Sequence, residues 1–142
     1  MPMRLLMIHC SYFKYEVKAR GRSSIAESIS SSRARGEARD LLLVLVSVEK
    51  RDEENLLKAC QKAAEEVSRH CKRIGVGSVV IHSFAHLFAD LSSPQAALEA
   101  TMKLEELLKA RGYQVKRTPF GWFHEVELKA KGHPLSRVAR QV

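Results

Sequence analysis

Hydrophobic residues fall into a few blocks along the chain, and the spacing inside each block predicts its secondary structure. A nearly continuous apolar run, LLLVLV at 41–46, predicts a central strand that is buried on both faces. Residues 3–18 predict either two strands or one bent strand, because apolar and polar positions alternate in YFKYEVK. A further strand and its exit are expected at SVVIHSFAHL, residues 78–87. Residues 113–134 predict two more strands joined at TPFG, an X-Pro turn with glycine.

Two segments follow the period of an α-helix instead. From Asp52 to Ile74, apolar positions recur at helical spacing, with acidic residues at the start and basic residues at the end. The glycines of GVG at 75–77 are expected to end this helix. A second helix is expected from an N-cap at Ser93, with proline in its first turn, as far as Gly112.

The remaining segments complete the expected architecture. Residues 19–39 are rich in Ser and Arg and predict a surface loop with room for one short helical turn. Residues 134–142 predict a short terminal helix. We expect a single domain over residues 1–142 of the α+β class, a two-layer fold in which two main helices pack against a mixed β-sheet.

The charge of the chain favours one class of binding partner. With 142 residues it is long enough for one domain with its own core, and its formal net charge is +8. An excess of Lys and Arg on a small domain favours a polyanionic partner, usually nucleic acid, and a basic surface without a partner is the alternative. No apolar run approaches the roughly 18 residues of a membrane span, and the N-terminus lacks a signal-peptide pattern. We therefore expect a cytoplasmic protein without membrane contact.

Motifs for metals and cofactors are missing. Cys10, Cys60 and Cys71 form no CxxC pair, which predicts reduced thiols and neither a disulfide framework nor a thiolate zinc site. His82 and His86 are four residues apart, but at a strand exit this spacing does not bring two metal ligands together. The motifs of nucleotide binding and of serine hydrolases are also absent. We expect no metal and no cofactor.

Several histidines fall near the expected ends of strands: His9, His86, His124 and His133. If those strands share one sheet, their side chains could converge on a pocket. For His86, which stands in an apolar stretch, the residues alone leave two interpretations open. It is either a buried imidazole with satisfied hydrogen bonds or a residue of a binding pocket.

Four stretches closely resemble one known family: LLMIHCSYFKYEVK, VLVSVEKRDE, FAHLFADLSSP and TPFGWFHEVELKAKGHPLSR. In the same order along the whole chain, they are similar to the N-terminal editing domain of archaeal threonyl-tRNA synthetases, and FAHL, PFG and KGHPL are specific in combination. The resemblance implies a fold similar to that of the D-aminoacyl-tRNA deacylases. It also implies hydrolysis of L-seryl-tRNA(Thr). Such a second site is useful because a missing methyl group supplies only about 1–3 kcal/mol of discrimination in synthesis.

The resemblance implies a site formed by eight residues: Val48, Ala85, His86, Pro119, Phe120, Phe123, His124 and Arg137. His86 and His124 are the candidate catalytic residues among them. The others would form the walls of the pocket and hold the amino acid, in part through main-chain contacts.

The chain departs from the family at three of these positions. The family has tyrosine, lysine and glutamate where this chain has Phe123, His124 and Arg137. A neutral imidazole does not reproduce a permanent ammonium charge. The departure therefore favours chemistry by main-chain groups and by the terminal 2′-hydroxyl of the tRNA, which would position the attacking water, while His86 helps to position the substrate.

The partners implied by the resemblance are the 3′ end of tRNA(Thr) carrying serine, the catalytic module of threonyl-tRNA synthetase in cis or in trans, and a second copy of the chain in a homodimer. Two alternatives stay open. One is a D-aminoacyl-tRNA deacylase of the same fold, and the other is a tRNA-binding appendix without catalysis.

Overall fold

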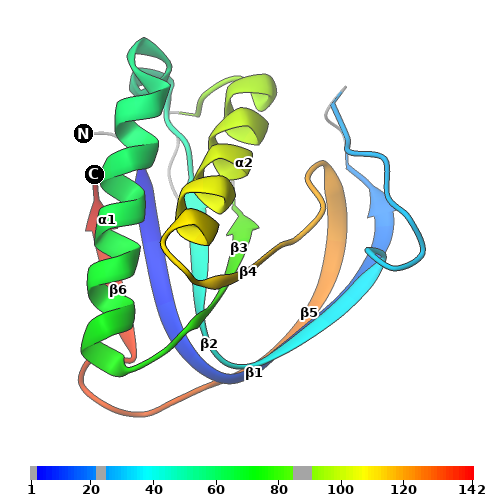
Figure 1. Cartoon of the computed structure of the whole chain (residues 1–142). Coiled ribbons are helices and arrows are strands. Elements are labelled where there is room, and N and C mark those ends of the chain that lie inside the picture. Colours follow the sequence, from blue (N-terminus) through cyan, green and yellow to red (C-terminus); the bar gives the residue numbers. More distant parts are fainter. Residues whose placement is uncertain (1–2, 22–24, 85–90) are drawn as a thin grey trace.

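The computed structural model describes residues 3–21, 25–84 and 91–142. Figure 1 shows a curved sheet with two long helices on one side of it. The elements are β1 (Arg4–Arg20), β2 (Arg35–Ser47), the 3₁₀ helix η1 (Lys50–Glu54), α1 (Leu56–Ile74), β3 (Ser78–Ser83), α2 (Pro94–Ala110), β4 (Gln114–Arg117), β5 (Trp122–Ala130) and β6 (Arg137–Gln141).

The strands form a six-stranded sheet in the order β4-β3-β2-β1-β5, and β6 pairs with the first half of β1. The pairs β2–β3 and β3–β4 are parallel, whereas β1 is antiparallel to β2, β5 and β6. Both helices cover the same face of this mixed sheet (Figure 1). The expected α+β architecture of two main helices on a mixed sheet is therefore confirmed.

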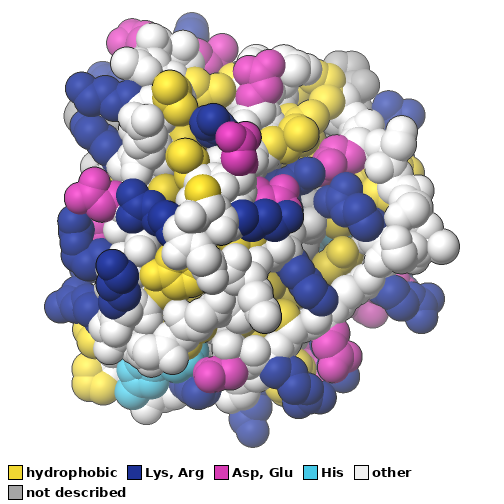
Figure 2. All heavy atoms as spheres, in the orientation of Figure 1, with side chains coloured by type: hydrophobic (Ala, Val, Ile, Leu, Met, Phe, Trp, Pro, Cys, Tyr) yellow, Lys and Arg dark blue, Asp and Glu magenta, His cyan; other side chains and the backbone are white. Residues whose placement is uncertain are grey.

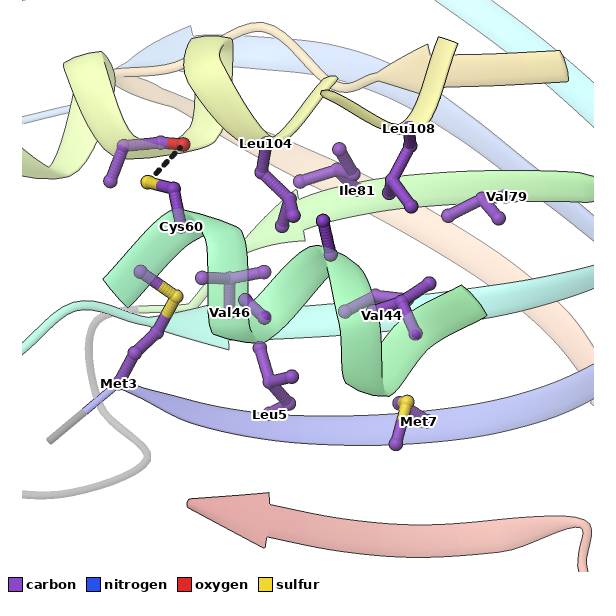
Figure 3. Packing of buried hydrophobic residues seen from close by; sticks show 14 of the residues in the cluster. Met3, Leu5, Met7, Val44, Val46, Cys60, Val79, Ile81, Leu104 and Leu108 are labelled. Atoms are coloured by element: carbon purple, nitrogen blue, oxygen red, sulfur yellow. Dashed lines mark hydrogen bonds between the residues drawn. The ribbon is translucent and has the colours of Figure 1, made fainter. Parts of the chain in front are cut away.

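The main core lies between the helices and the sheet. Leu5 of β1 and Val44 of β2 pack in one cluster with Leu104 of α2, and none of the three is more than 1% exposed (Figure 3). The Sγ of Cys60 donates to the Ala100 carbonyl at 3.4 Å and so links α1 to α2. All three cysteines are free and buried, which confirms the prediction of reduced thiols.

The opposite face of the sheet carries a second, smaller core. Because side chains alternate along a strand, Leu41 and Leu43 point away from the helices, and they are buried in a cluster with Phe13. The outer halves of β1 and β2 curve away from the helices together with β5 (Figure 1). The predicted burial of 41–46 on both faces is confirmed, although Leu45 is only half-buried.

The helix expected over 134–142 is wrong, because residues Arg137–Gln141 form the strand β6. This strand pairs with β1 from Arg4 to Ile8. Backbone N–H and C=O groups along that edge of β1 need partners, and a segment this short gains little from barely more than one helical turn. Pairing with the sheet therefore decides its conformation.

The loop expected at 19–39 is shorter than predicted. β1 continues to Arg20 and β2 begins at Arg35, so that Glu16 lies opposite Arg35 in the ladder. Backbone pairing does not require apolar side chains, and opposite charges across two strands support it. The low hydrophobicity of this stretch therefore hid the ends of both strands.

The starts of the two helices differ in how well the sequence predicted them. Asp52 does not open α1, because it lies in η1 and accepts the N–H of Glu49 at 2.7 Å. α1 begins at Leu56, after the N-cap Asn55. The predicted N-cap of α2 is confirmed, since the Ser93 hydroxyl accepts a backbone N–H at 3.2 Å. Within the ranges described, no helix is both long and apolar enough to cross a membrane.

Candidate functional site

The candidate site lies on the sheet face opposite the helices, where β3 ends beside the turn between β4 and β5. The N–H of Thr118, the first residue of this turn, donates to the Ile81 carbonyl at 3.0 Å. The Thr118 hydroxyl also lies 2.9 Å from Nδ1 of His82. At the other end of the turn, Gly121 has a φ of 87°, a conformation that glycine adopts without strain. The turn therefore holds the end of β3 next to the start of β5.

Two histidines face each other at this point. His82 of β3 and His124 of β5 have ring centroids 5.3 Å apart, with planes at 71°. Tyr15 of β1 lies edge-on to His124 at 5.8 Å, and Phe13 lies 6.4 Å from His82. These contacts are typical of aromatic packing and place both imidazoles in a largely apolar environment.

This environment keeps both imidazoles neutral. Burial lowers the pKa of His82 to about 4, and electrostatic repulsion from His124 adds to the effect. Burial also lowers the pKa of His124, although a hydrogen bond to the Pro119 carbonyl opposes that change. At neutral pH neither ring carries a charge, which distinguishes the site from one built around a lysine.

One ring nitrogen of His124 is left without a partner. Its Nε2 atom is buried and makes no hydrogen bond to any described residue. A buried polar atom without a partner costs free energy, so this atom is available for a hydrogen bond with a ligand or with water.

The main chain of the turn is partly occupied. The N–H of Phe120 donates to a carboxylate oxygen of Glu27 at 2.7 Å, and the Phe120 carbonyl accepts the N–H of Glu27 at 3.0 Å. A substrate would therefore meet the turn mainly through the Pro119 carbonyl and the side chains. The sequence placed Pro119 and Phe120 at the site, and both belong to the turn that precedes β5, the strand of His124.

The other predicted site residues are more dispersed. Val48 belongs to the core on the helix side, and its carbonyl accepts the N–H of Ser92 at 3.0 Å. Phe123 is 57% exposed and, as the neighbour of His124 on β5, points to the opposite side of the strand. Ala85 and His86 lie outside the described residues.

Arg137 is far from His124 within one chain. It begins β6 and pairs with Ile8 of β1, whereas His124 pairs with Val17. These two positions of β1 are nine residues apart, up to about 30 Å along a straight strand. The two side chains therefore do not share one pocket of the same chain.

The histidines near strand ends form two groups rather than one. Nδ1 of His9 lies 2.9 Å from Nε2 of His133, and Nε2 of His9 lies 3.1 Å from the Asp40 carboxylate. His9 is eight positions along β1 from Val17, the partner of His124. His9 and His133 therefore do not share a pocket with His124, although the sequence left such a convergence open.

Sequence reasoning missed two residues that shape the site, His82 and Glu27. The sequence did carry a signal for His82. It lies two residues after the buried Val80 on β3, so the two side chains point to the same face of the sheet. Glu27 gave no comparable signal, because its partners are distant in sequence. No three His, Cys, Asp or Glu side chains among the described residues are grouped as metal ligands would be.

Comparisons with known proteins identify the family. The sequence model of the archaea-specific editing domain of threonyl-tRNA synthetase matches residues 3–142. The chain is 39% identical over 140 residues to the threonine–tRNA ligase of Thermococcus gammatolerans, which covers 99% of this chain and 22% of that protein. Identity to the ligase of Methanocaldococcus jannaschii is 36%, and to that of Methanopyrus kandleri 40%, with the same coverage.

Among solved structures, the chain is similar to the c-Myc DNA unwinding element binding protein, with a TM-score of 0.69, 12% identity and 98% of each chain covered. At this identity the similarity shows a shared fold. The sequence matches show the family as well as the fold, although the chain spans only about a fifth of the length of the ligases. The protein therefore belongs to the family of archaea-specific editing domains of threonyl-tRNA synthetase.

Proposed function

We propose that this domain removes serine from tRNA(Thr) that has been charged with the wrong amino acid. The observation that carries the proposal is the match to the editing-domain family from residue 3 to residue 142. Selection in synthesis gains only about 1–3 kcal/mol from the methyl group that distinguishes threonine from serine, so a second site that hydrolyses the error is needed. Water would attack the ester carbonyl carbon, and the bond to the 3′ oxygen would break to release serine and intact tRNA.

The proposed chemistry depends on positioning rather than on a charged side chain. Both described imidazoles of the site are neutral at neutral pH, and the buried, unpartnered Nε2 of His124 would form a hydrogen bond with an O–H group. That O–H group would belong to the attacking water or to the terminal 2′-hydroxyl of the tRNA, which lies next to the ester. Main-chain acceptors such as the Pro119 carbonyl would hold the seryl group. His86 retains its proposed role in holding the substrate.

The proposed partners follow from charge and from exposed apolar groups. A net charge of +8 favours binding to the tRNA backbone, and Lys and Arg side chains are spread over the helix-bearing face in Figure 2.

β5 is the last strand of the sheet order, and its side chains Val126 and Leu128 are 43% and 37% exposed. We propose that this strand contributes to a homodimer, and that the synthetase catalytic module acts with the domain in cis or in trans.

The proposal is tested with purified domain and tRNA(Thr) charged with labelled L-serine. We expect the ester to be lost much faster than without protein. A parallel reaction with a D-aminoacyl-tRNA should be slower. Faster loss of the D-amino acid would assign the domain to chiral deacylation, and no acceleration of either reaction would leave only tRNA binding.

A further inference from the structure

A buried hydroxyl group at the end of β2 has no hydrogen-bond partner. Ser47 is the last residue of β2 and is 0% exposed. Its Oγ atom makes no hydrogen bond to any residue that the structure describes. Buried polar groups are nearly always hydrogen-bonded, because an unpaired one costs free energy. The Oγ of Ser47 is therefore in the same state as Nε2 of His124 in the candidate site.

The side chain of Ser47 points to the face of the sheet that carries the site. Side chains alternate along β2, and Val46 belongs to the core between the helices and the sheet. Leu43 and Leu45 belong to or pack against the second core on the opposite face. Ser47, two residues after Leu45, therefore points to that opposite face, together with the imidazoles of the site.

The hydroxyl lies close to the two histidines. His82 of β3 pairs with Leu45 in a parallel ladder, two residues before Ser47. Neighbouring strands are about 4.8 Å apart and two residues span about 6.6 Å, so the Cα atoms of Ser47 and His82 are about 8 Å apart. The ring of His82 lies 5.3 Å from that of His124. Ser47 and His124, each with an unpartnered buried atom, therefore both lie beside His82.

The surface next to Ser47 is not sealed by the core. Its neighbours on this face, Leu6, Leu45 and His82, are each only half-buried. Leu6 pairs with Leu45 across the ladder of β1 and β2, and so lies on the same face. A small polar group of a ligand would therefore reach the hydroxyl between side chains that already contact solvent.

The charges around Ser47 favour a neutral ligand group. Arg4 lies directly opposite Ser47 in the ladder, and its Nε donates to the Glu49 carboxylate at 3.1 Å. A permanent positive charge at this position disfavours an ammonium group of a ligand beside it, and a buried ammonium needs a charged partner that a serine does not supply. A hydroxyl both donates and accepts, so another hydroxyl is a suitable partner for Ser47.

We infer that Ser47 is a specificity-determining residue, whose hydroxyl forms a hydrogen bond with the side-chain hydroxyl of the seryl group. The inference rests on the proposed function and adds a contact to it. A site that hydrogen-bonds a substrate hydroxyl discriminates against the analogue that lacks it. The domain would therefore select serine over alanine, separately from its exclusion of the methyl group of threonine.

The first test measures binding with two probes by calorimetry. They are adenosine analogues in which an amide replaces the 3′ ester, one carrying L-serine and the other L-alanine. We expect the wild type to bind the seryl probe about fivefold to twentyfold more tightly than the alanyl probe, as one buried hydrogen bond would give. Ser47→Ala should lose this factor for the seryl probe and bind the alanyl probe within about twofold of the wild type.

Ser68→Ala is the matched control for this substitution. Ser68 of α1 is also buried, at 3% exposure, but its hydroxyl has a partner in the Tyr113 hydroxyl at 3.0 Å. It should leave the affinity for both probes unchanged.

The second test is the urea midpoint of the free protein, which a purely structural role would lower. We expect Ser47→Ala to unfold at the same or a higher urea concentration than the wild type, because the alanine removes an unpaired hydroxyl. Ser68→Ala should unfold at a lower concentration, because it breaks a hydrogen bond within the protein.

The outcomes separate the inference from the proposed function. Unchanged affinity of Ser47→Ala for the seryl probe, or a lowered urea midpoint, would overturn the inference alone. An equal loss for both probes would place a group that serine and alanine share beside Ser47, which also overturns it. A wild type that neither binds the seryl probe nor hydrolyses seryl-tRNA(Thr) would reject the proposed function, and the inference with it.

Discussion

The half-buried carboxylate of Glu27, which accepts hydrogen bonds from Arg117, Arg33 and the N–H of Phe120, stabilises the fold by an amount that depends on pH. Its pKa is about 2 in the folded protein, against an ordinary value of 4.5. A carboxyl group whose pKa is lower in the folded than in the unfolded protein stabilises the fold at pH values above its unfolded pKa. For Glu27 this stabilisation is lost as the pH falls from about 4.5 through 2. The shift of about 2.5 units corresponds to about 3 kcal/mol at pH 6, about 2 kcal/mol at pH 3.5 and less than about 1 kcal/mol at pH 2.5.

Urea unfolding of the wild type and of Glu27→Gln at several pH values isolates this contribution from other groups. We expect the difference in unfolding free energy between the two proteins to shrink by about 2 kcal/mol between pH 6 and pH 2.5. Glu65→Gln is the control, because Glu65 is 62% exposed in its pair with Arg69, and its difference should stay below about 1 kcal/mol at all pH values. A difference for Glu27→Gln that does not change with pH, or that grows in acid, would refute the reasoning.

Three further predictions concern the site and the assembly. His124→Ala should lower the rate of deacylation by roughly tenfold or less, whereas seryl-tRNA ending in 2′-deoxyadenosine should be nearly inert. An inactive His124→Ala variant, together with normal cleavage of the deoxy substrate by the wild type, would instead show a side-chain mechanism. Gly121→Ala should cost more than about 1 kcal/mol in urea unfolding, because φ is 87° and the added Cβ would meet the Ile25 carbonyl; an unchanged midpoint would contradict the close packing of residues 25 and 26 against Gly121. Light scattering should give a dimer at tens of micromolar that Val126→Lys weakens, and a monomeric wild type would contradict the interface.

The sequence predicted the elements whose side chains decide their conformation. LLLVLV had to be a buried strand, the apolar spacing from Leu56 to Ile74 required a helix, and Ser93 gave a capped helix start. It failed where the backbone of another segment decides. β6 exists because β1 offers an unpaired edge, and the polar ends of the β1–β2 hairpin form because the two strands pair with each other.

The site residues also differ in whether the sequence could predict them. The turn TPFG and His124 could be placed from the sequence, because a proline–glycine turn between strands has a definite place in a sheet. Glu27 could not, since it is separated by more than ninety residues from Phe120, which it contacts. Contacts of this kind depend on how residues 25–34 lie against Arg117 and the turn that follows it, and no local pattern in the sequence records this arrangement.

The central claim is that the domain distinguishes serine from threonine on the same tRNA. It is tested most directly by charging one preparation of tRNA(Thr) with L-serine and another with L-threonine, and measuring the hydrolysis rate of each ester with the wild-type protein. We predict rapid loss of serine and at least about a hundredfold slower loss of threonine, since the extra methyl group has to be excluded by overlap and not merely by a weaker contact. Equal rates for the two esters, or no acceleration of either, would contradict the claim.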